Sequence, residues 1–285
     1  MKYSYIKNKD ELLTYLGGFE EKKTHIIALD IEAEMNLHSY GEKLCLVQIF
    51  DGQNRVIIDP LDIGNTDLKS LFESKNILKV MYDASSDSWL LKNSHDIELT
   101  SVLDLRPAVD LLEYEKQDLH SVIAADLGIV LNRKNRYQKF NWVRRPIDRG
   151  AMVYALNDVI HLLKLKDIIY KKLLARELLD QFLLKNLQLQ CRDFTRNPED
   201  RYRKIKGYGR LTDAEKAMFL RVFAVRDKYA KMADMPPHNI ITNADLVTIV
   251  KDSRHINDIR FLKRFSVNFI KGIVAELELA VSQKA

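Results

Sequence analysis

The sequence predicts an α/β fold, in which a mixed sheet is covered by helices, followed by a small all-helical module. Strand-like segments rich in β-branched and aliphatic residues are confined to residues 25–105, whereas the chain beyond them has almost continuous helical periodicity. One helical segment lies between the last two predicted strands, as in crossover connections. A polar, basic and turn-rich stretch at 195–210 then separates a final helical region, 211–285, from the rest.

The first predicted elements alternate with turn residues. A short helix is expected over 10–16, and the first three strands are expected over 25–32, 44–50 and 55–61. Gly41-Glu42 and Asp51-Gly52 provide turns between these strands. Because connections this short join adjacent antiparallel strands, we expect an antiparallel meander.

The next elements complete a sheet of five predicted strands. The order is a short helix at 68–73, a strand at 76–82, a helix at 85–92 and a strand at 98–105. The helical pattern beyond them is broken at 132–141 and at Arg145-Pro146. Thr212, with Glu215 three residues later, has the spacing of a capping box and should open the final helical module.

The composition is that of an ordinary globular protein. The chain has 285 residues, 46% of them hydrophobic and 30% charged, which argues against a disordered or fibrous protein. No apolar run approaches the roughly 20 residues of a membrane span, and the charged first residues lack the apolar stretch of a signal peptide. The two cysteines, Cys45 and Cys191, form no CxxC pair. We therefore expect a cytoplasmic protein with no membrane partner.

The positive charge is concentrated in the last part of the chain. From residue 200 onward there are 17 Lys and Arg against 10 Asp and Glu, whereas the preceding residues carry 28 against 30. A basic region behind a nearly neutral one suits a polyanionic partner. A basic helical face that only keeps the protein soluble explains the same numbers equally well.

Two acidic residues stand out in the first predicted strand. Asp30 and Glu32 are two residues apart, so their side chains should leave the same face of the strand. The preceding residues are almost all apolar, which indicates a buried central strand. Paired carboxylates there are costly unless a cation compensates them. The alternative is that this end of the strand is solvated.

Two later segments add acids and a tyrosine. Asp87 should lie in the first turn of the helix after the fourth strand. Tyr154 and Asp158 are four residues apart and should share one face of a long helix, where Asp158 interrupts an apolar surface. Each residue taken alone is explained by a helix cap or a core tyrosine. Together they suggest a carboxylate cluster assembled from a strand and two helices.

These motifs, in this order, resemble those of the DEDD superfamily of 3′–5′ exonucleases in its tyrosine-bearing branch, and within that branch those of ribonuclease D. The first motif is Asp30-Ile31-Glu32, the second ends in Asp87, and the third runs from Tyr154 to Asp158. Supporting segments lie at 43–52, 56–61, 100–108 and 141–147. The resemblance covers residues 20–172 and implies a ribonuclease H-like sheet.

The chain departs from the family pattern at two positions. The family often has threonine where Ile31 stands and histidine where Tyr82 stands. Neither position is a metal-binding carboxylate, so the departures bear on substrate preference. The final region resembles, more weakly, the HRDC (helicase and ribonuclease D C-terminal) domain. The resemblance divides the chain into an exonuclease domain at 1–172, a connecting helix and linker at 173–210, and an HRDC domain at 211–285.

The resemblance also implies the chemistry. Two divalent cations, Mg²⁺ or Mn²⁺, would be held by oxygen ligands without any small-molecule cofactor. Asp30, Glu32 and Asp158 would hold the cation that carries the attacking water, and Asp30 would bridge to a second one supported by Asp87. Tyr154 would orient the nucleophile through a hydrogen bond.

The expected activity is hydrolysis of single-stranded RNA from the 3′ end, with the maturation of tRNA precursors and other stable RNA as the natural task. The alternatives are an exonuclease on short oligoribonucleotides or DNA ends, and a non-catalytic nucleic-acid-binding protein. The presence of all four acids and the tyrosine argues against the last of these.

Segment 131–147 combines cations with aromatic rings, as single-strand binding sites do. We expect Trp142 to be buried. The residues expected to face the substrate are Arg133, Lys134, Arg136, Tyr137, Lys139 and Arg144. His38 and Tyr40 could meet the terminal nucleotide, although a plain loop role explains them as well. The HRDC-like region would add nucleic-acid affinity or would serve as a packing or protein-contact module.

Overall fold

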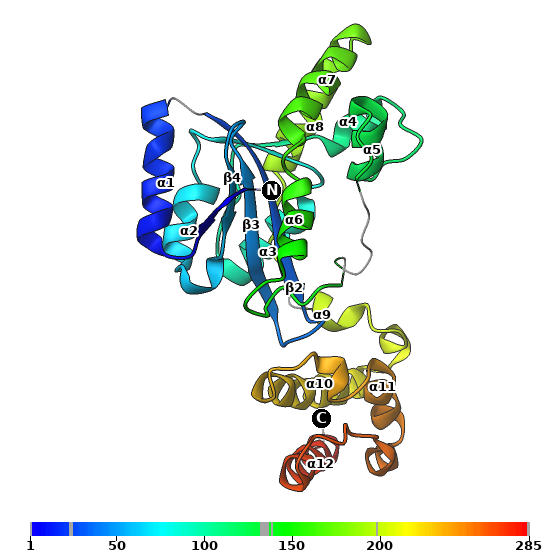
Figure 1. Cartoon of the computed structure of the whole chain (residues 1–285). Coiled ribbons are helices and arrows are strands. Elements are labelled where there is room, and N and C mark those ends of the chain that lie inside the picture. The colour runs from blue at the N-terminus through cyan, green and yellow to red at the C-terminus, as the bar shows by residue number, and fades with distance from the viewer. Residues whose placement is uncertain (1, 23–24, 132–136, 138, 198, 284–285) are drawn as a thin grey trace. The chain divides into compact units, whose positions relative to one another are not determined.

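The computed structural model of the chain describes residues 2–283 apart from 23–24, 132–136, 138 and 198 (Figure 1). The chain divides into two compact units. The first comprises Met1–Ala33 and Lys43–Thr195, and the second comprises Glu34–Glu42 and Arg196–Ala285. The units are therefore not two successive segments of the chain. The domain boundaries given by the family resemblance stay a prediction.

The first unit is built on a mixed sheet with the strand order β1-β4-β3-β2-β5-β6. The strands are β1 (Ser4–Ile6), β2 (Ile26–Met35), β3 (Glu42–Phe50), β4 (Arg55–Ile58), β5 (Leu78–Met81) and β6 (Val102–Asp104). Strands β3 and β4 are antiparallel, as the Asp51-Gly52 turn predicts. The pairs β1–β4, β2–β5 and β5–β6 are parallel. The mixed sheet predicted from the sequence is confirmed.

The predicted number of five strands is wrong, because β1 adds a sixth. This strand has only three residues, and two of them are exposed, so the sequence shows no alternation of apolar and polar residues there. It is held at the sheet edge by pairing with β4, in which Tyr5 lies opposite Ile57. The Tyr5 hydroxyl also donates a hydrogen bond to Asp59 Oδ2 at 2.6 Å.

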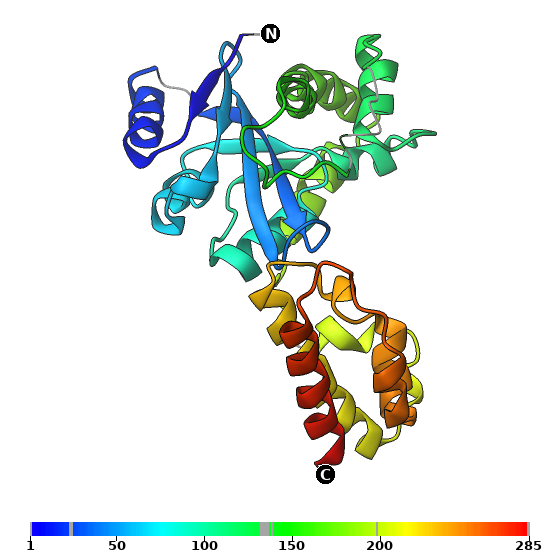
Figure 2. The same cartoon turned by 60° about the horizontal axis from the view of Figure 1, so that its bottom comes forward.

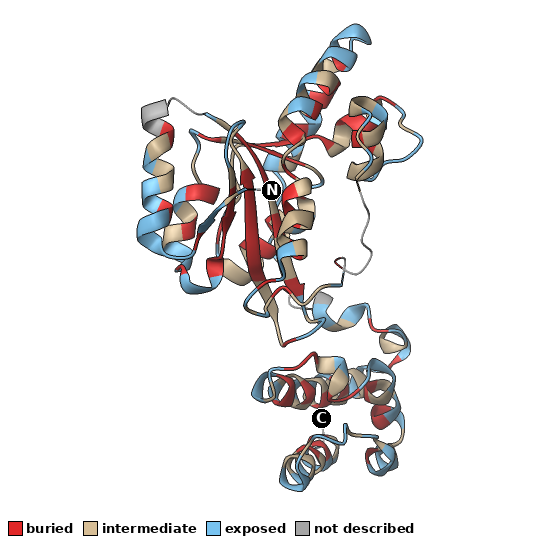
Figure 3. Cartoon of the chain, in the orientation of Figure 1, coloured by how far each residue is buried: buried red, intermediate tan, exposed pale blue. Residues whose placement is uncertain are grey.

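Helices cover both faces of the sheet (Figures 1 and 3). They are α1 (Lys9–Lys22), α2 (Asn65–Phe72), α3 (Ser85–His95), α4 (Arg106–Leu111), α5 (Leu119–Leu127), α6 (Arg149–Asn157), α7 (Leu162–Ala175) and α8 (Leu179–Gln190). Helices α1 to α3 contribute to the core on one face, and α4 to α8 contribute to the core on the other. Strand β2 shares its residues between the two, since Ile27, Leu29 and Ile31 enter the first core and Ala28 enters the second.

The second unit is all-helical in its C-terminal part, as predicted. Its helices are α9 (Asp200–Arg203), α10 (Asp213–Met232), α11 (Asn243–Lys251) and α12 (Val267–Ser282). Thr212 and Glu215 form the expected capping box at the start of α10. Helix α12 runs alongside α10 (Figure 2), and Phe219 and Ile273 are fully buried in the core of this unit. Within the described part of the chain, every helix is too short or too polar to cross a membrane.

Candidate active site

Strand β2 presents its two acids on the face opposite to its large apolar side chains. Leu29 and Ile31 are buried in the core beneath α1 to α3, so the alternation of the strand turns Asp30 and Glu32 toward the side of α4 to α8. The two carboxylates are only partly exposed. The spacing Asp-x-Glu therefore places both groups on one buried face, as predicted.

Asp158 completes a cluster with these two acids. One carboxylate oxygen from each of Asp30, Glu32 and Asp158 lies within 4.8 Å of the others. The long helix expected around Asp158 is wrong, because α6 ends at Asn157 and α7 begins only at Leu162. Asp158 is the C-terminal cap of α6.

Asp87 interacts electrostatically with the acids of strand β2. It lies in the first turn of α3, as predicted, and its charge contributes to raising the pKa values of Asp30 and Glu32. Burial, followed by the charges of Asp83 and Asp104, raises the pKa of Asp87 itself to about 7. The structure therefore brings all four predicted acids close enough for their charges to interact.

None of the four acids has a Lys or Arg partner among the described residues. Burial is the main cause that raises the pKa values of Asp30 and Glu32 well above their usual range, and the neighbouring carboxylates raise them further. In the part of the chain that the structure describes, no Lys or Arg forms an ion pair with Asp30, Glu32 or Asp87. Clustered oxygen ligands with uncompensated charge fit hard divalent cations such as Mg²⁺ or Mn²⁺.

His120 belongs to the site but was not predicted from the sequence. It lies on α5, and its Nε2 is 2.8 Å from Asp158 Oδ1. Its ring also meets the ring of Tyr154 edge-on, with centroids 6.3 Å apart. The contact joins residues 38 apart in the chain, and His120 belongs to no motif, so no local pattern indicates it. His120 fixes the orientation of the Asp158 carboxylate.

Tyr154 is held by aromatic neighbours. The Tyr137 ring packs on it with centroids 5.4 Å apart, and Tyr137 in turn contacts Phe140. The expectation that Tyr137 faces the substrate is wrong, because it is only 2% exposed and its hydroxyl donates to Asp148 Oδ1 at 2.9 Å. A side chain at Gly150 would collide with that hydroxyl, so the glycine allows Tyr137 to support Tyr154.

The rest of segment 131–147 is only partly described. Arg133, Lys134 and Arg136 lie outside the described residues, whereas Lys139 and Arg144 are exposed. Trp142 is buried, which confirms that prediction.

Arg145 anchors this segment instead of facing the substrate. Its guanidinium group forms a bidentate pair with Asp59, with Nε–Oδ2 and Nη2–Oδ1 distances of 2.6 and 2.7 Å. It also donates to the backbone oxygens of Cys45 and Trp142.

The two residues expected to meet the terminal nucleotide differ in their environments. His38 is exposed. Tyr40 lies in the second unit, where its hydroxyl donates to Asp227 Oδ2 at 2.9 Å and its ring packs against the helical core. Tyr40 therefore anchors segment Glu34–Glu42, and the structure does not support a free role for it at a nucleotide.

Replacing Asp87 with asparagine should stabilise the metal-free protein. The pKa of Asp87 in the folded protein, about 7, lies above that of an unfolded aspartate, so folding favours the protonated carboxyl. The stability that this carboxyl contributes is fully present below about pH 4, and it is lost as the pH rises through 7. We expect Asp87→Asn to raise the free energy of unfolding by on the order of 1–3 kcal/mol near pH 8, and by less near pH 5. Urea unfolding in EDTA at the two pH values measures this difference.

Added Mn²⁺ provides the control. A cation that binds only the folded protein should stabilise the wild type more than Asp87→Asn, so that the order of stabilities reverses. A gain that is the same at both pH values would contradict the assignment of charge repulsion to Asp87.

Comparisons with known proteins agree with this geometry. The sequence profile described as 3′–5′ exonuclease matches residues 3–174. The chain is 24% identical over 258 residues to ribonuclease D of Shewanella sp. (strain ANA-3). The aligned region covers 87% of this chain and 64% of that protein. Across three curated relatives, the chain spans between 26% and 64% of their lengths.

Two crystal structures share the fold. Escherichia coli RNase D, described as an exoribonuclease involved in structured RNA processing, superimposes with a TM-score of 0.76 at 22% identity, covering 99% of this chain and 76% of that one. The catalytic core of RRP6 from Trypanosoma brucei superimposes with a TM-score of 0.78 at 21% identity, covering 98% and 79%. These likenesses confirm the ribonuclease H-like fold expected from the sequence.

Proposed function

The chain belongs to the 3′–5′ exonuclease family, and from this premise we propose that it hydrolyses single-stranded RNA from the 3′ end. The observation that carries the proposal is the cluster of Asp30, Glu32 and Asp158, with Asp87 beside it and no Lys or Arg partner among the described residues. A non-catalytic protein that only bound nucleic acid would have no reason to keep four close carboxylates that repel one another.

Each residue has a specific task in this reaction. Two bound divalent cations would supply Lewis acidity both for the attacking water and for the leaving 3′ oxygen. Asp30, Glu32 and Asp158 would hold one of them, and Asp30 and Asp87 the other. The Tyr154 hydroxyl would orient the nucleophile by a hydrogen bond, while His120 keeps the Asp158 carboxylate in place.

The preference for RNA is supported by the relatives named ribonuclease D and by the RNA processing described for the Escherichia coli protein. We extend the proposal to the maturation of tRNA or other stable RNA 3′ ends in the cytoplasm, as the resemblance of the motifs to ribonuclease D implies. The C-terminal helices would act as an HRDC domain that adds affinity for the substrate. Short oligoribonucleotides and DNA ends stay as the alternative substrates.

End-labelled RNA and DNA ladders of several lengths test the proposal directly. We expect stepwise shortening from the 3′ end of 5′-labelled RNA with Mg²⁺ or Mn²⁺, and none with EDTA. Faster degradation of DNA would favour an exonuclease on DNA ends, and degradation of dinucleotides only would favour an exonuclease on short oligoribonucleotides. Absence of cleavage with every substrate and metal would refute the exonuclease proposal.

Exposed cations before α12 should strengthen RNA binding. Arg260 and Lys263 are both exposed in the second unit, next to the partly buried rings of Phe261 and Phe265. Each phosphate contact on a single strand contributes about 0.7 to the slope of log affinity against log salt. We therefore expect the double change to glutamine to lower that slope by about 0.7–1.4, without changing turnover at saturating substrate.

The matched control changes two exposed lysines of the first unit, Lys171 and Lys185, to glutamine. This variant has the same net charge as the test variant but keeps the proposed contacts of Arg260 and Lys263. Fluorescence anisotropy with a labelled oligonucleotide at several salt concentrations gives the slopes. Equal slopes for the two variants would show that the C-terminal helical region does not bind RNA through Arg260 and Lys263.

A further inference from the structure

A buried aspartate controls the turn that leads into α3. Asp104, at the end of β6, is 3% exposed and lies outside the four-acid cluster. Its Oδ1 accepts hydrogen bonds from the backbone N–H groups of Asp83 at 2.8 Å and Arg106 at 2.9 Å. Its Oδ2 accepts a third from Ala84 at 3.0 Å. One carboxylate thus satisfies three backbone donors, two in the turn before α3 and one at the start of α4.

That turn has a backbone conformation that needs support. Asp83 has a φ of 62°, in the left-handed region that residues other than glycine seldom adopt. Helix α3 begins two residues later, and Asp87 lies in its first turn. The direction in which Asp87 approaches the cluster is therefore set by a strained turn that the Asp104 carboxylate holds in place.

Asp104 is itself fixed by a residue of α8. Asn186 is 3% exposed, and its Oδ1 accepts the Asp104 N–H at 2.7 Å. Its Nδ2 donates to the backbone oxygens of Asp104 at 3.2 Å and of Phe182 at 3.1 Å. Asparagine is a weak helix former, and a buried amide is tolerated only when its hydrogen bonds are made. Both facts point to a specific task for Asn186.

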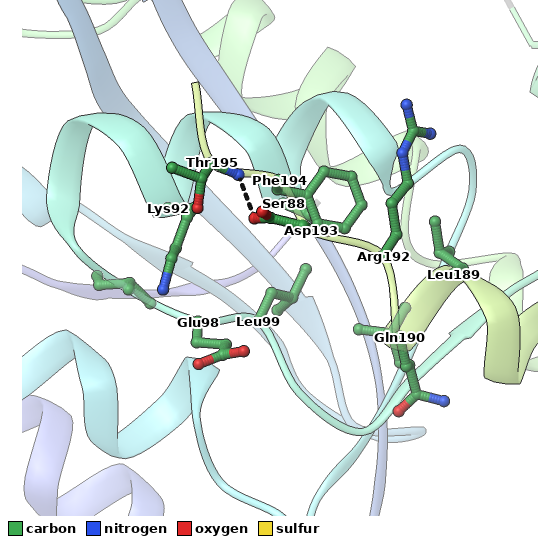
Figure 4. A pocket seen from close by; sticks show the side chains of 12 residues that line it. Ser88, Lys92, Glu98, Leu99, Leu189, Gln190, Arg192, Asp193, Phe194 and Thr195 are labelled. Atoms are coloured by element: carbon green, nitrogen blue, oxygen red, sulfur yellow. Dashed lines mark hydrogen bonds between the residues drawn. The ribbon is translucent and has the colours of Figure 1, made fainter. Parts of the chain in front are cut away.

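The segment after α8 holds the other end of α3. Asn93, in the last turn of α3, donates through Nδ2 to the backbone oxygen of Phe194 at 2.7 Å. A cavity of about 140 Å³ lies between α3 and this segment. Figure 4 shows that Arg192, Phe194 and Thr195 line it together with Ser88 and Lys92 of α3. Helix α8 and this segment lie beyond the residues 3–174 that match the exonuclease family.

We propose that Asn186 and Asp104 form a positioning pair that places Asp87 in the active site. Helix α8 then supports the active site through Asn186, although it lies outside residues 3–174, which match the family. Neither residue touches the reacting atoms; Asn186 orients Asp104, Asp104 holds the turn at Asp83-Ala84, and the turn directs α3. The inference rests on the proposed function for its kinetic consequences, but its effect on metal affinity is independent of any substrate.

The main test is Asn186→Leu in the full chain, which keeps the volume of the side chain and removes its hydrogen bonds. We expect the affinity for Mn²⁺, measured by calorimetry without substrate, to fall about 10–100-fold, as for the loss of other groups that orient metal ligands. The kcat should fall on a similar scale while KM changes by less than about threefold, because the RNA-binding surface is intact. The exposed α8 residue Gln188 gives the matched control, Gln188→Ala, which should behave as the wild type.

A rescue experiment separates positioning from general stability. Asp104→Asn should also weaken Mn²⁺ binding, because one charged acceptor of the turn is lost. Adding Asp83→Gly should restore part of the affinity, since glycine adopts the left-handed conformation without steric cost. Asp83→Asn in the same background removes the same charge but gives less backbone freedom, and it should restore less. If Asn186→Leu does not fold, the Mn²⁺ affinities of the Asp104→Asn variants test the proposal instead.

Several outcomes would overturn the proposal. A folded Asn186→Leu protein with a lower melting temperature but unchanged Mn²⁺ affinity and kcat would show a purely structural role. Equal rescue by the two Asp83 changes would show that charge, and not the turn, controls Asp87. If the wild type binds Mn²⁺ but cleaves no nucleic acid, the proposed function fails, while the affinities still decide whether the pair positions Asp87.

Discussion

Replacing Asp30 with asparagine should lower the rate of RNA hydrolysis by about 10³–10⁴-fold, which corresponds to the several kcal/mol that bound metal ions contribute to such reactions. A carboxylate oxygen of Asp30 lies within 4.8 Å of oxygens from Glu32 and Asp158, and the charge of Asp87 acts on it as well. The amide offers one neutral oxygen where a carboxylate offers two charged ones. Rates with 5′-labelled RNA at saturating Mg²⁺ measure the loss.

The loss of activity should not come from unfolding. Burial and the neighbouring acids raise the pKa of Asp30 well above its usual range, so its charge is a cost to the metal-free fold at neutral pH. We expect metal-free Asp30→Asn to melt at the same temperature as the wild type or slightly higher. Cleavage within tenfold of the wild-type rate by a folded Asp30→Asn protein would refute the assignment of the metal site.

The second large effect is expected at Tyr154. If its hydroxyl orients the nucleophile, Tyr154→Phe should lower kcat by roughly 10²–10⁴-fold, the usual contribution of a positioned proton-transfer or hydrogen-bonding group. The ring would keep its contacts with Tyr137 and His120, so the fold and the Mn²⁺ affinity should change little.

The control for Tyr154 is its aromatic neighbour. Tyr137→Phe removes a hydroxyl that is bonded to Asp148, which is not one of the four clustered acids, and should reduce kcat much less than Tyr154→Phe. Single-turnover rates with excess enzyme separate the chemical step from product release. A Tyr154→Phe protein with the wild-type single-turnover rate would make Tyr154 a core tyrosine only.

The elements with strong local signals could be predicted from the sequence. Strands β2 to β5 have apolar runs bounded by turn residues, and the capping box at Thr212 marks the start of α10. Strand β1 lacks such a signal because two of its three residues are exposed. The break between α6 and α7 was missed because the apolar spacing continues through residues 158–161, where the backbone leaves the helix.

The active site was only partly predictable. The motifs, through their resemblance to the exonuclease family, predict that Asp30, Glu32, Asp87 and Asp158 share one site, and the structure brings them together. The partners that hold them come from distant positions, as His120 does for Asp158 and Asn186 does for Asp104. Tyr137 was misplaced because basic neighbours in the sequence suggested an exposed loop, whereas its hydroxyl had a partner in Asp148. Such pairings depend on tertiary contacts that local patterns do not encode.

The course of the chain between the two units has a practical consequence for proteolysis. Segment Glu34–Glu42 belongs to the same unit as the C-terminal helices, and its Tyr40 and Glu42 bond to Asp227 and Arg196. A protease that cuts once between Thr195 and Arg196 should therefore release no free fragment. The two pieces should migrate together in gel filtration and separate only in denaturant. A recombinant protein that ends at residue 195 would, for the same reason, expose the Tyr40 segment without its partner helices.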